Sequence, residues 1–166
     1  MALHQRIGQG IDFHRLEEGR ELWLGGVHVV SHKGCVAHSD GDVLIHAICD
    51  AILGAAGMND IGTQFPDTSD EYKGIDSKIL LKRTVAMVTE KGYRIVNIDS
   101  TVCLETPRLA PYISEMRRIM AAIADISPDA ISVKATTTEK MGFTGRGEGA
   151  MAIAVCLISD RIPESF

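Results

Sequence analysis

The sequence predicts a single α+β domain in which a mixed β-sheet carries helices on one face. Three observations lead to this fold class. Strand and helix signals alternate from end to end, and no repeat, low-complexity stretch or linker divides the chain. The 166 residues are also the length of one ordinary domain, which can bury about 70% of its unfolded surface. We therefore expect one two-layer domain over residues 1–166.

The first half of the chain is expected to form a strand, a hairpin and a helix. Alternation over residues 6–14 predicts a strand with Ile7, Ile11 and Phe13 toward the core and Asp12 and His14 on the other face. The remaining elements are a hairpin of residues 22–24 and 27–30 around Gly25-Gly26, and a helix from Val43 to the glycines at 54 and 57, capped by Ser39 or Asp40.

The second half continues the alternation. The expected elements are a helix at 76–91 ended by Gly92, a strand at 93–104, a helix opened by Pro111 with Ile113, Met116, Met120 and Ile123 on one face, and strands at 131–135 and 150–158. A glycine-rich loop at 141–149 joins the last two strands. It is neither a P-loop nor a dinucleotide fingerprint, because it leads into a strand and lacks the Gly-Lys-Ser/Thr ending.

Composition excludes several classes of protein. A hydrophobic fraction of 45% without an apolar run near the roughly 20 residues of a membrane span predicts no membrane segment. A net charge of -5 without a run of Lys or Arg argues against a nucleic-acid surface. Four scattered cysteines without a C-x-x-C pair indicate reduced, structural thiols. Since no targeting peptide is visible, we expect a cytoplasmic protein, or a plastid protein if this is a processed organellar form.

Asp12 and His14 point the same way from the predicted strand and form half of a metal site. The best third ligand is His46, because Asp42 and Asp50 lie one helical turn to either side and either carboxylate could orient its ring. Two His and one Asp would leave zinc one free position, as in catalytic sites. Taken alone, the spacing favours solvent-facing polar residues on an amphipathic strand over a metal site.

Two further segments could bind phosphate. The run from His38 to Asp42 precedes a helix, where unpaired N–H groups favour an anion, although an ordinary capping segment explains the same residues. The run from Lys134 to Lys140 offers three threonine hydroxyls, and Glu139 could anchor Mg²⁺ or Mn²⁺. Threonine at a strand end is otherwise common, because it favours strands.

Four segments together resemble the 2-C-methyl-D-erythritol 2,4-cyclodiphosphate synthase family. They read RIGQGIDFH at 6–14, AHSDGDVLIHAICDAILGA at 37–55, DIGTQFPD at 60–67 and KATTTEKMGFTGRGEG at 134–149. The resemblance covers nearly the whole chain in the right order. Gln9, where the family often has His, and a tail from Ser159 to Phe166 depart from the pattern without touching a ligand position.

The resemblance implies a set of site residues. Asp12, His14 and His46 would bind Zn²⁺, Glu139 would bind Mg²⁺ or Mn²⁺ together with the substrate phosphates, and His38 and Thr137 would stabilise the transition state. The substrate-binding residues would be Asp12, His14, His38, Ser39, Asp60, Gly62, Phe65, Asp67, Leu104, Pro107, Arg108, Ala110, Thr136, Thr137, Thr138, Glu139, Phe143 and Arg146.

The implied reaction converts 4-diphosphocytidyl-2-C-methyl-D-erythritol 2-phosphate to the cyclic 2,4-diphosphate and releases CMP. The family is a homotrimer whose sites lie between neighbouring chains, and its threefold axis can hold an isoprenoid diphosphate near Arg146 and Glu148. Two alternatives remain open at this point. The same ligands could serve a metal-dependent phosphohydrolase, or the chain could be a non-catalytic trimer that binds isoprenoid diphosphates.

Overall fold

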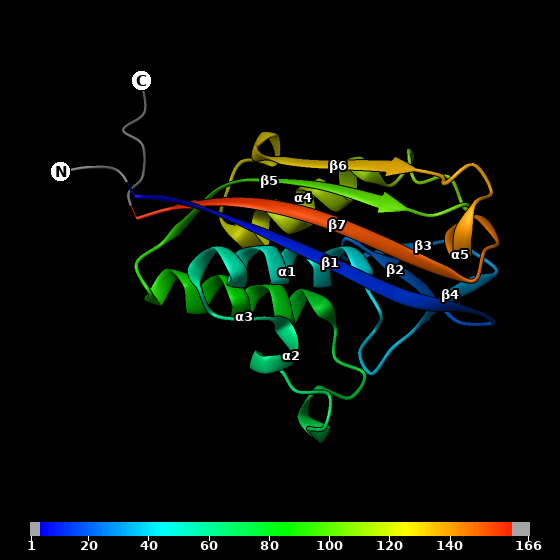
Figure 1. Ribbon diagram of the computed structural model, residues 1–166, viewed down its shortest axis with the longest axis horizontal. Coiled ribbons are helices and arrows are strands. Elements are labelled where there is room, and N and C mark those ends of the chain that lie inside the picture. Colours follow the sequence, from blue (N-terminus) through cyan, green and yellow to red (C-terminus); the bar gives the residue numbers. More distant parts are fainter. Residues whose placement is uncertain (1–3, 161–166) are drawn as a thin grey trace.

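A five-stranded mixed sheet with its helices on one face forms the domain, as the sequence predicted (Figure 1). The computed structural model describes residues 4–160. The strands are β1 (Gln5–Glu18), β4 (Lys33–Val36), β5 (Arg94–Cys103), β6 (Ile131–Thr136) and β7 (Gly149–Ser159), in the order β4-β1-β7-β5-β6, with β2 (Leu22–Leu24) and β3 (Val27–Val29) as a separate hairpin. Only β5 and β6 pair in parallel among these strands of the described chain.

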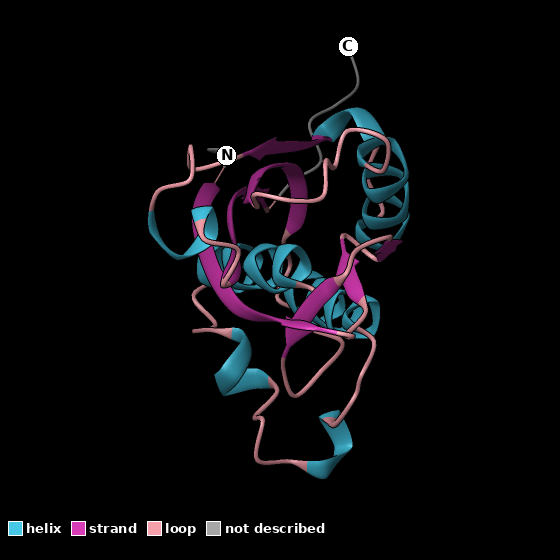
Figure 2. Ribbon diagram, turned by 90° about the vertical axis from the view of Figure 1, so that its right-hand side faces the viewer, coloured by secondary structure: helices cyan, strands magenta, loops and turns pink. Residues whose placement is uncertain are grey.

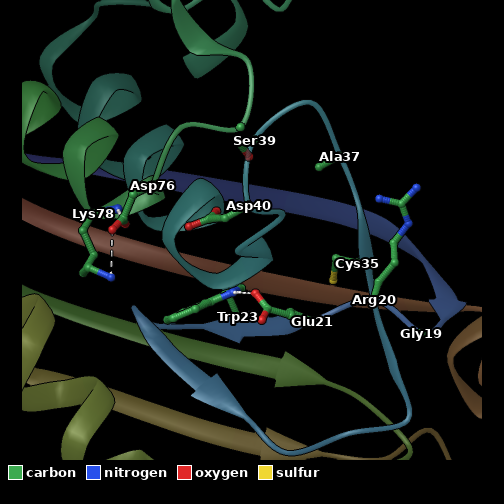
Figure 3. A pocket seen from close by; sticks show the side chains of 11 residues that line it. Gly19, Arg20, Glu21, Trp23, Cys35, Ala37, Ser39, Asp40, Asp76 and Lys78 are labelled. Atoms are coloured by element: carbon green, nitrogen blue, oxygen red, sulfur yellow. Dashed lines mark hydrogen bonds and ion pairs between the residues drawn. The ribbon is translucent and has the colours of Figure 1, made fainter.

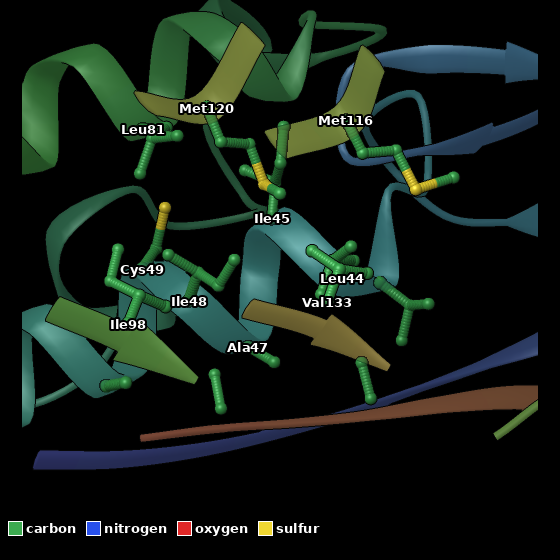
Figure 4. Packing of buried hydrophobic residues seen from close by; sticks show 14 of the residues in the cluster. Leu44, Ile45, Ala47, Ile48, Cys49, Leu81, Ile98, Met116, Met120 and Val133 are labelled. Carbon is green, nitrogen blue, oxygen red and sulfur yellow. The ribbon is translucent and has the colours of Figure 1, made fainter. Parts of the chain in front are cut away.

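Three long helices cover one face of the sheet. They are α1 (Val43–Ala56), which packs on β1 and β7, α4 (Ile113–Ala124), which packs on β6, and α3 (Ser77–Glu90), which lies against the other two helices. Their contact surface is apolar and fully buried, and it includes Ile45 and Ile48 of α1, Leu81 of α3, and Met116 and Met120 of α4 (Figure 4). The predicted buried face of α4 is therefore confirmed at both methionines.

The prediction for the two faces of β1 was wrong. Ile7, Ile11 and Phe13 are 73%, 42% and 52% exposed, whereas Gly8 and Gly10 face α1 and are buried. The reason is the closeness of the helix, since a Cβ at Gly10 would lie 1.9 Å from the carbonyl oxygen of Ala47. Only glycine fits between β1 and α1, so the large apolar side chains take the opposite face.

Helix α1 is capped by Asp42 and not, as expected, by Ser39 or Asp40. The Asp42 carboxylate is fully buried and accepts the backbone N–H of Ile45 at 3.0 Å. It also accepts the N–H groups of Gly25 and Gly26 at 2.9 and 2.7 Å, which ties the β2–β3 turn to the start of the helix. This double role explains why the cap lies at Asp42, because a residue further upstream could not reach both the turn and the helix.

The limits of the other helices agree with expectation for α3 and differ for α4 and α5. Helix α3 begins after Asp76, whose side chain accepts the N–H of Lys78, so its predicted limits are confirmed to within a residue. Pro111 does not open α4, which begins two residues later at Ile113. The predicted loop at 141–149 contains the short helix α5 (Gly142–Gly145).

Short elements escaped prediction because they span too few residues to show a period. They are β4, α2 (Ile61–Gln64) and the 3₁₀ turns Asp70–Tyr72 and Pro128–Ala130. Helix α2 and the turn after it lie outside the main body of the domain, beneath α1 and α3 (Figures 1 and 2). The four cysteines are free thiols, and all residues of the expected tail after Asp160 lie outside the described part. No helix within residues 4–160 combines the length and the apolar character that crossing a bilayer requires.

The contact between β1 and α1 makes a testable prediction. We expect Gly10→Ala to destabilise the fold by at least about 3 kcal/mol, because the new methyl group meets backbone that cannot move without shifting the helix. Gly54→Ala is the matched control. Its Cβ would meet only the Gln9 carbonyl oxygen, at an ordinary 3.8 Å, and alanine should stabilise an exposed helical position by about 0.5–1 kcal/mol. Chemical denaturation of both variants measures the difference, and equal effects would contradict the proposed packing constraint.

Candidate active site

Asp12, His14 and His46 converge on one point at the edge between β1 and α1. The Asp12 Oδ2 atom lies 3.0 Å from His14 Nε2 and 3.1 Å from His46 Nδ1, and the two imidazole nitrogens lie 3.0 Å apart. The side chains are partly or largely buried. The strand thus supplies two donors and the helix supplies the third, as the sequence predicted.

The three side chains are electrostatically coupled. Burial disfavours a charged Asp12, but hydrogen bonds to His14 and His46 outweigh burial and hold the pKa of the Asp12 carboxyl well below its usual range. Burial also disfavours a charged His46 ring, yet the hydrogen bond and the charge of Asp12 raise the pKa of His46. Asp12 therefore stays an anion at neutral pH, available as a ligand.

This group fits a divalent metal ion. One carboxylate oxygen and two imidazole nitrogens lie within 4.8 Å of one another. Two nitrogens and one oxygen are a donor set that zinc accepts while keeping a fourth position open. The chain therefore has a group of three side chains that could hold a metal ion.

The expectation that Asp42 or Asp50 orients the His46 ring was wrong. Asp42 is taken up by backbone N–H groups, and Asp50 accepts the N–H of Ile61 at 2.7 Å. The Nε2 atom of His46 instead lies 2.9 Å from the hydroxyl of Ser77 and 3.2 Å from that of Ser39. Ser77 carried no signal in the sequence, because the first residue of a helix after an aspartate cap looks like ordinary capping chemistry.

The convergent group opens into a cavity of about 330 Å³. Of the residues implied by the resemblance, it is lined by Asp12, His14, His38, Ser39, His46, Gly62, Phe65 and Asp67, and the sequence did not indicate its apolar wall of Tyr72, Ile75 and Leu80. The Phe65 and Tyr72 rings meet edge to face with centroids 5.7 Å apart. Asp60 caps α2 through the N–H of Thr63 and stands beside this wall without lining it. The cavity therefore combines polar groups at one end with an apolar wall.

A second cavity of about 540 Å³ lies on the other side of the same loop. It is lined by Arg20, Trp23, Cys35, Asp40, Lys78 and their neighbours, and it shares Ala37 and Ser39 with the first cavity (Figure 3). Residues 37–40 thus separate the two cavities.

The threonine-rich segment lies elsewhere on the sheet. Strand β6 ends at Thr136, next to the end of β5, where the N–H of Leu104 donates to the Thr136 carbonyl at 3.1 Å. Strands β7 and β5 separate β6 from β1, so the two segments are about three strand spacings, or roughly 14 Å, apart. None of Leu104, Pro107, Arg108, Ala110 and residues 136–139 lines the cavity of the three ligands.

Glu139 occupies an unusual backbone conformation. Its backbone φ angle is 54° and that of Lys140 is 64°, both in the left-handed region that residues other than glycine rarely adopt. The Glu139 Oε1 atom accepts the hydroxyl of Thr137 at 2.9 Å, so the two residues hold each other within this turn. Strain of this kind is concentrated at functional sites.

Phe143 and Arg146 lie near the exposed face of β1 and not in the ligand cavity. The rings of Phe143 and Phe13 have centroids 5.9 Å apart, and Arg146 forms a two-point ion pair with Glu148 at 2.9 Å. The structure therefore divides the implied site residues into three groups: the metal cavity, the end of β5 and β6, and the region around α5.

Known proteins resemble this chain over nearly its whole length. The model of the YgbB family matches residues 5–159. A 2-C-methyl-D-erythritol 2,4-cyclodiphosphate synthase of Bacteroides thetaiotaomicron is 59% identical over 153 residues, which are 92% of this chain and 96% of that protein. One of Laribacter hongkongensis is 54% identical over 162 residues, 98% of this chain and 100% of that protein.

Solved structures agree with the fold. The bifunctional IspDF of Campylobacter jejuni has a TM-score of 0.92 and 42% identity, covering 95% of this chain and 43% of that one. The CDP complex of IspF from Plasmodium falciparum has a TM-score of 0.82 and 33% identity, covering 99% of this chain and 100% of that one.

Proposed function

This chain belongs to the YgbB family, and we infer that it has the activity of its relatives, the synthesis of 2-C-methyl-D-erythritol 2,4-cyclodiphosphate. It is a lyase of the isoprenoid pathway that closes the cyclic product and releases CMP. One observation carries this conclusion: relatives of that name are more than 50% identical over at least 92% of the chain. The three convergent side chains are consistent with it.

The substrate that we propose is 4-diphosphocytidyl-2-C-methyl-D-erythritol 2-phosphate. An oxygen of its 2-phosphate forms a bond to the β-phosphorus, the bond from that phosphorus to the bridging oxygen breaks, and CMP leaves with the bridging oxygen. Two anions must meet in this step. Unit charges about 4 Å apart repel by about 1 kcal/mol in water and about 4 kcal/mol at an effective dielectric near 20. An enclosed site therefore needs cations.

We propose Zn²⁺ on Asp12, His14 and His46, and Mg²⁺ or Mn²⁺ on Glu139. These ions would polarise the attacked phosphoryl group and neutralise charge on the departing CMP. The ionised Asp12 and the convergence of the three donor atoms support the zinc assignment. Since the nucleophile is part of the substrate, the protein needs to supply alignment and charge rather than a nucleophile of its own.

The cavity walls supply the remaining contacts. We assign phosphate binding to His38 and Ser39, and transition-state stabilisation to His38 and Thr137. We assign binding of the methylerythritol part to Asp60, Gly62, Phe65 and Asp67. The mixed lining of the cavity supports this division, because the substrate has a polar phosphate end and a branched carbon skeleton.

We propose that the cytidine and its phosphates bind at Leu104, Pro107, Arg108, Ala110 and residues 136–139 of a neighbouring chain. The separation of about three strand spacings between β1 and β6 supports this assignment, since one substrate molecule would have to cross the sheet to reach both groups within one chain. A cyclic assembly would place the end of β6 from one chain beside the metal group of the next.

The exposed face of the sheet supports the homotrimer. Ile7, Ile11 and Phe13 of β1 and Val155 of β7 are exposed apolar side chains on the face opposite the helices, with Gln9 among them. Soluble proteins rarely leave such a surface uncovered. We propose that three copies bury it around a threefold axis, and that Phe143, Arg146 and Glu148 would line a site there for an isoprenoid diphosphate.

Product analysis tests the function. Incubation of the cytidyl substrate in ¹⁸O-labelled water should give CMP and a cyclic diphosphate, both without label, because the attacking oxygen comes from the substrate. Mass spectrometry detects the label. Incorporation of ¹⁸O into a phosphate product would support the alternative phosphohydrolase, and absence of turnover would support the non-catalytic trimer.

Metal content tests the ligand assignment. Purified protein should contain about one zinc per chain, and His46→Ala should lose it, because two ligands hold zinc much less tightly than three. His28→Ala is the control, since His28 is an exposed histidine of β3 outside the ligand group. Elemental analysis measures the ratio. Equal zinc in wild type and His46→Ala would show that His46 is not a ligand.

Complementation tests the shared site. His46→Ala and Glu139→Gln should each be inactive, but a mixed trimer contains one interface in three at which an intact metal group meets an intact Glu139. With random mixing about three quarters of trimers are mixed, so co-refolding of equal amounts should restore about a quarter of wild-type CMP release.

The matched control co-refolds His14→Ala with His46→Ala, which damage the same half of the site and should not rescue each other. Native mass spectrometry confirms that mixed trimers form. Mixed trimers of His46→Ala and Glu139→Gln that stay inactive would place each site within one chain.

A further inference from the structure

A buried chain of hydrogen bonds runs from Asp40 through Ser77 to the ring of His46. The Ser77 hydroxyl makes a short contact with Asp40 Oδ1 and lies 2.9 Å from His46 Nε2. The backbone N–H of Ser77 also donates to Asp40 Oδ2 at 2.9 Å. None of these residues belongs to the metal ligands or to the substrate-binding residues assigned above, apart from His46 itself.

The hydrogen-bond donors and acceptors in this chain favour one arrangement of protons. An ionised carboxylate can only accept, so the hydroxyl of Ser77 donates its hydrogen bond to Asp40. The Ser77 oxygen then accepts a hydrogen bond from the N–H at His46 Nε2. An imidazole that carries its proton on Nε2 has a free lone pair on Nδ1, and Nδ1 is the atom that faces Asp12 and His14.

Burial makes this arrangement dominant. Ser77 is 0% exposed, so water cannot replace Asp40 as the partner of its hydroxyl. Ser39 is the other hydroxyl near His46 Nε2, at 3.2 Å, but it lines the substrate cavity and already accepts the N–H of Gly41. Ser39 can therefore turn toward a ligand while Ser77 keeps the ring in place.

Asp40 is itself held from two sides. Its Oδ1 atom accepts the N–H of Asp42 at 3.2 Å, and its own N–H donates to the Ile75 carbonyl at 3.1 Å. Figure 3 shows the Asp40 carboxylate in the wall of the second cavity, pointing toward the start of α3. The start of α1 and the start of α3 are thus joined at this carboxylate, which fixes Ser77 relative to His46.

We propose that Asp40 and Ser77 are positioning residues that fix the tautomer and the orientation of His46 for the metal. This proposal rests on the proposed metal site. Hydrogen bonds behind a ligating histidine commonly change metal affinity by about 10–100-fold. We expect Ser77→Ala to weaken zinc binding by about that factor, although Ser77 does not touch the metal.

The experiment measures zinc affinity of the assembled protein by competition with a chelator of known affinity. Ser100→Ala is the matched control, because Ser100 is a 1% exposed serine of β5 whose hydroxyl donates to the Ser132 carbonyl at 2.8 Å. Both variants lose a buried hydrogen bond, so both should lose stability by similar amounts. Only Ser77→Ala should lose zinc affinity.

A spectroscopic signature separates positioning from general weakening. In ¹⁵N-histidine-labelled, zinc-loaded wild type, the imidazole proton on His46 Nε2 should be strongly protected from exchange. Ser77→Ala should lose this protection, while Ser100→Ala should retain it. Asp40→Asn provides a second variant if Ser77→Ala does not fold, since the hydroxyl and the N–H of Ser77 donate to different oxygens of Asp40 and asparagine has only one oxygen.

Wild-type zinc affinity in Ser77→Ala, or in Asp40→Asn where that variant is used, would overturn the relay and leave the metal site standing. A wild-type protein that binds no zinc would instead refute the metal site, and the relay with it.

Discussion

The close approach of α1 to β1 at Gly8 and Gly10 is the constraint on which the rest of the structure depends. A side chain at either glycine would penetrate the backbone of the helix, with contacts of 1.9 Å to Ala51 and Ala47. Gly10 lies two residues before Asp12, and Ala47 follows His46 directly. The distance between strand and helix therefore sets the distance between the ligands, and a metal site of this geometry requires glycine on the inner face of β1.

The same constraint explains the apolar outer face of the sheet. Since the inner face of β1 admits only small groups near α1, the bulky residues Ile7, Ile11 and Phe13 lie on the opposite side. An isolated chain would expose this surface to water, at a cost that grows with its area. Burial against further copies would remove this cost, and the proposed trimer would complete the substrate site by the same contact. The packing of one helix would thus link the proposed metal site to the proposed assembly.

The sequence alone predicted the elements that depend on local chemistry. The helix after Asp76, the hairpin at Gly25-Gly26 and the α+β class all follow from caps, turns and periodicity. It gave the wrong inner face for β1, because alternation shows that a strand has two faces and not which one meets a helix. Ser77 could not be identified either. Its role depends on a contact with a residue 31 positions away, which no local pattern encodes.

The position of Asp42 also decides between the two interpretations of the segment before α1. A free helix N-terminus could bind a phosphate through its N–H groups, but here the Asp42 carboxylate occupies the N–H of Ile45 and is itself completely buried. The N–H of Ile45 is therefore not available to a phosphate. In the proposed function, phosphate binding in the cavity would therefore rely on side chains such as His38 and Ser39 and on cations. A cation held by Asp12, His14 and His46, rather than the helix dipole, would balance the charge of the proposed substrate, which carries three phosphates.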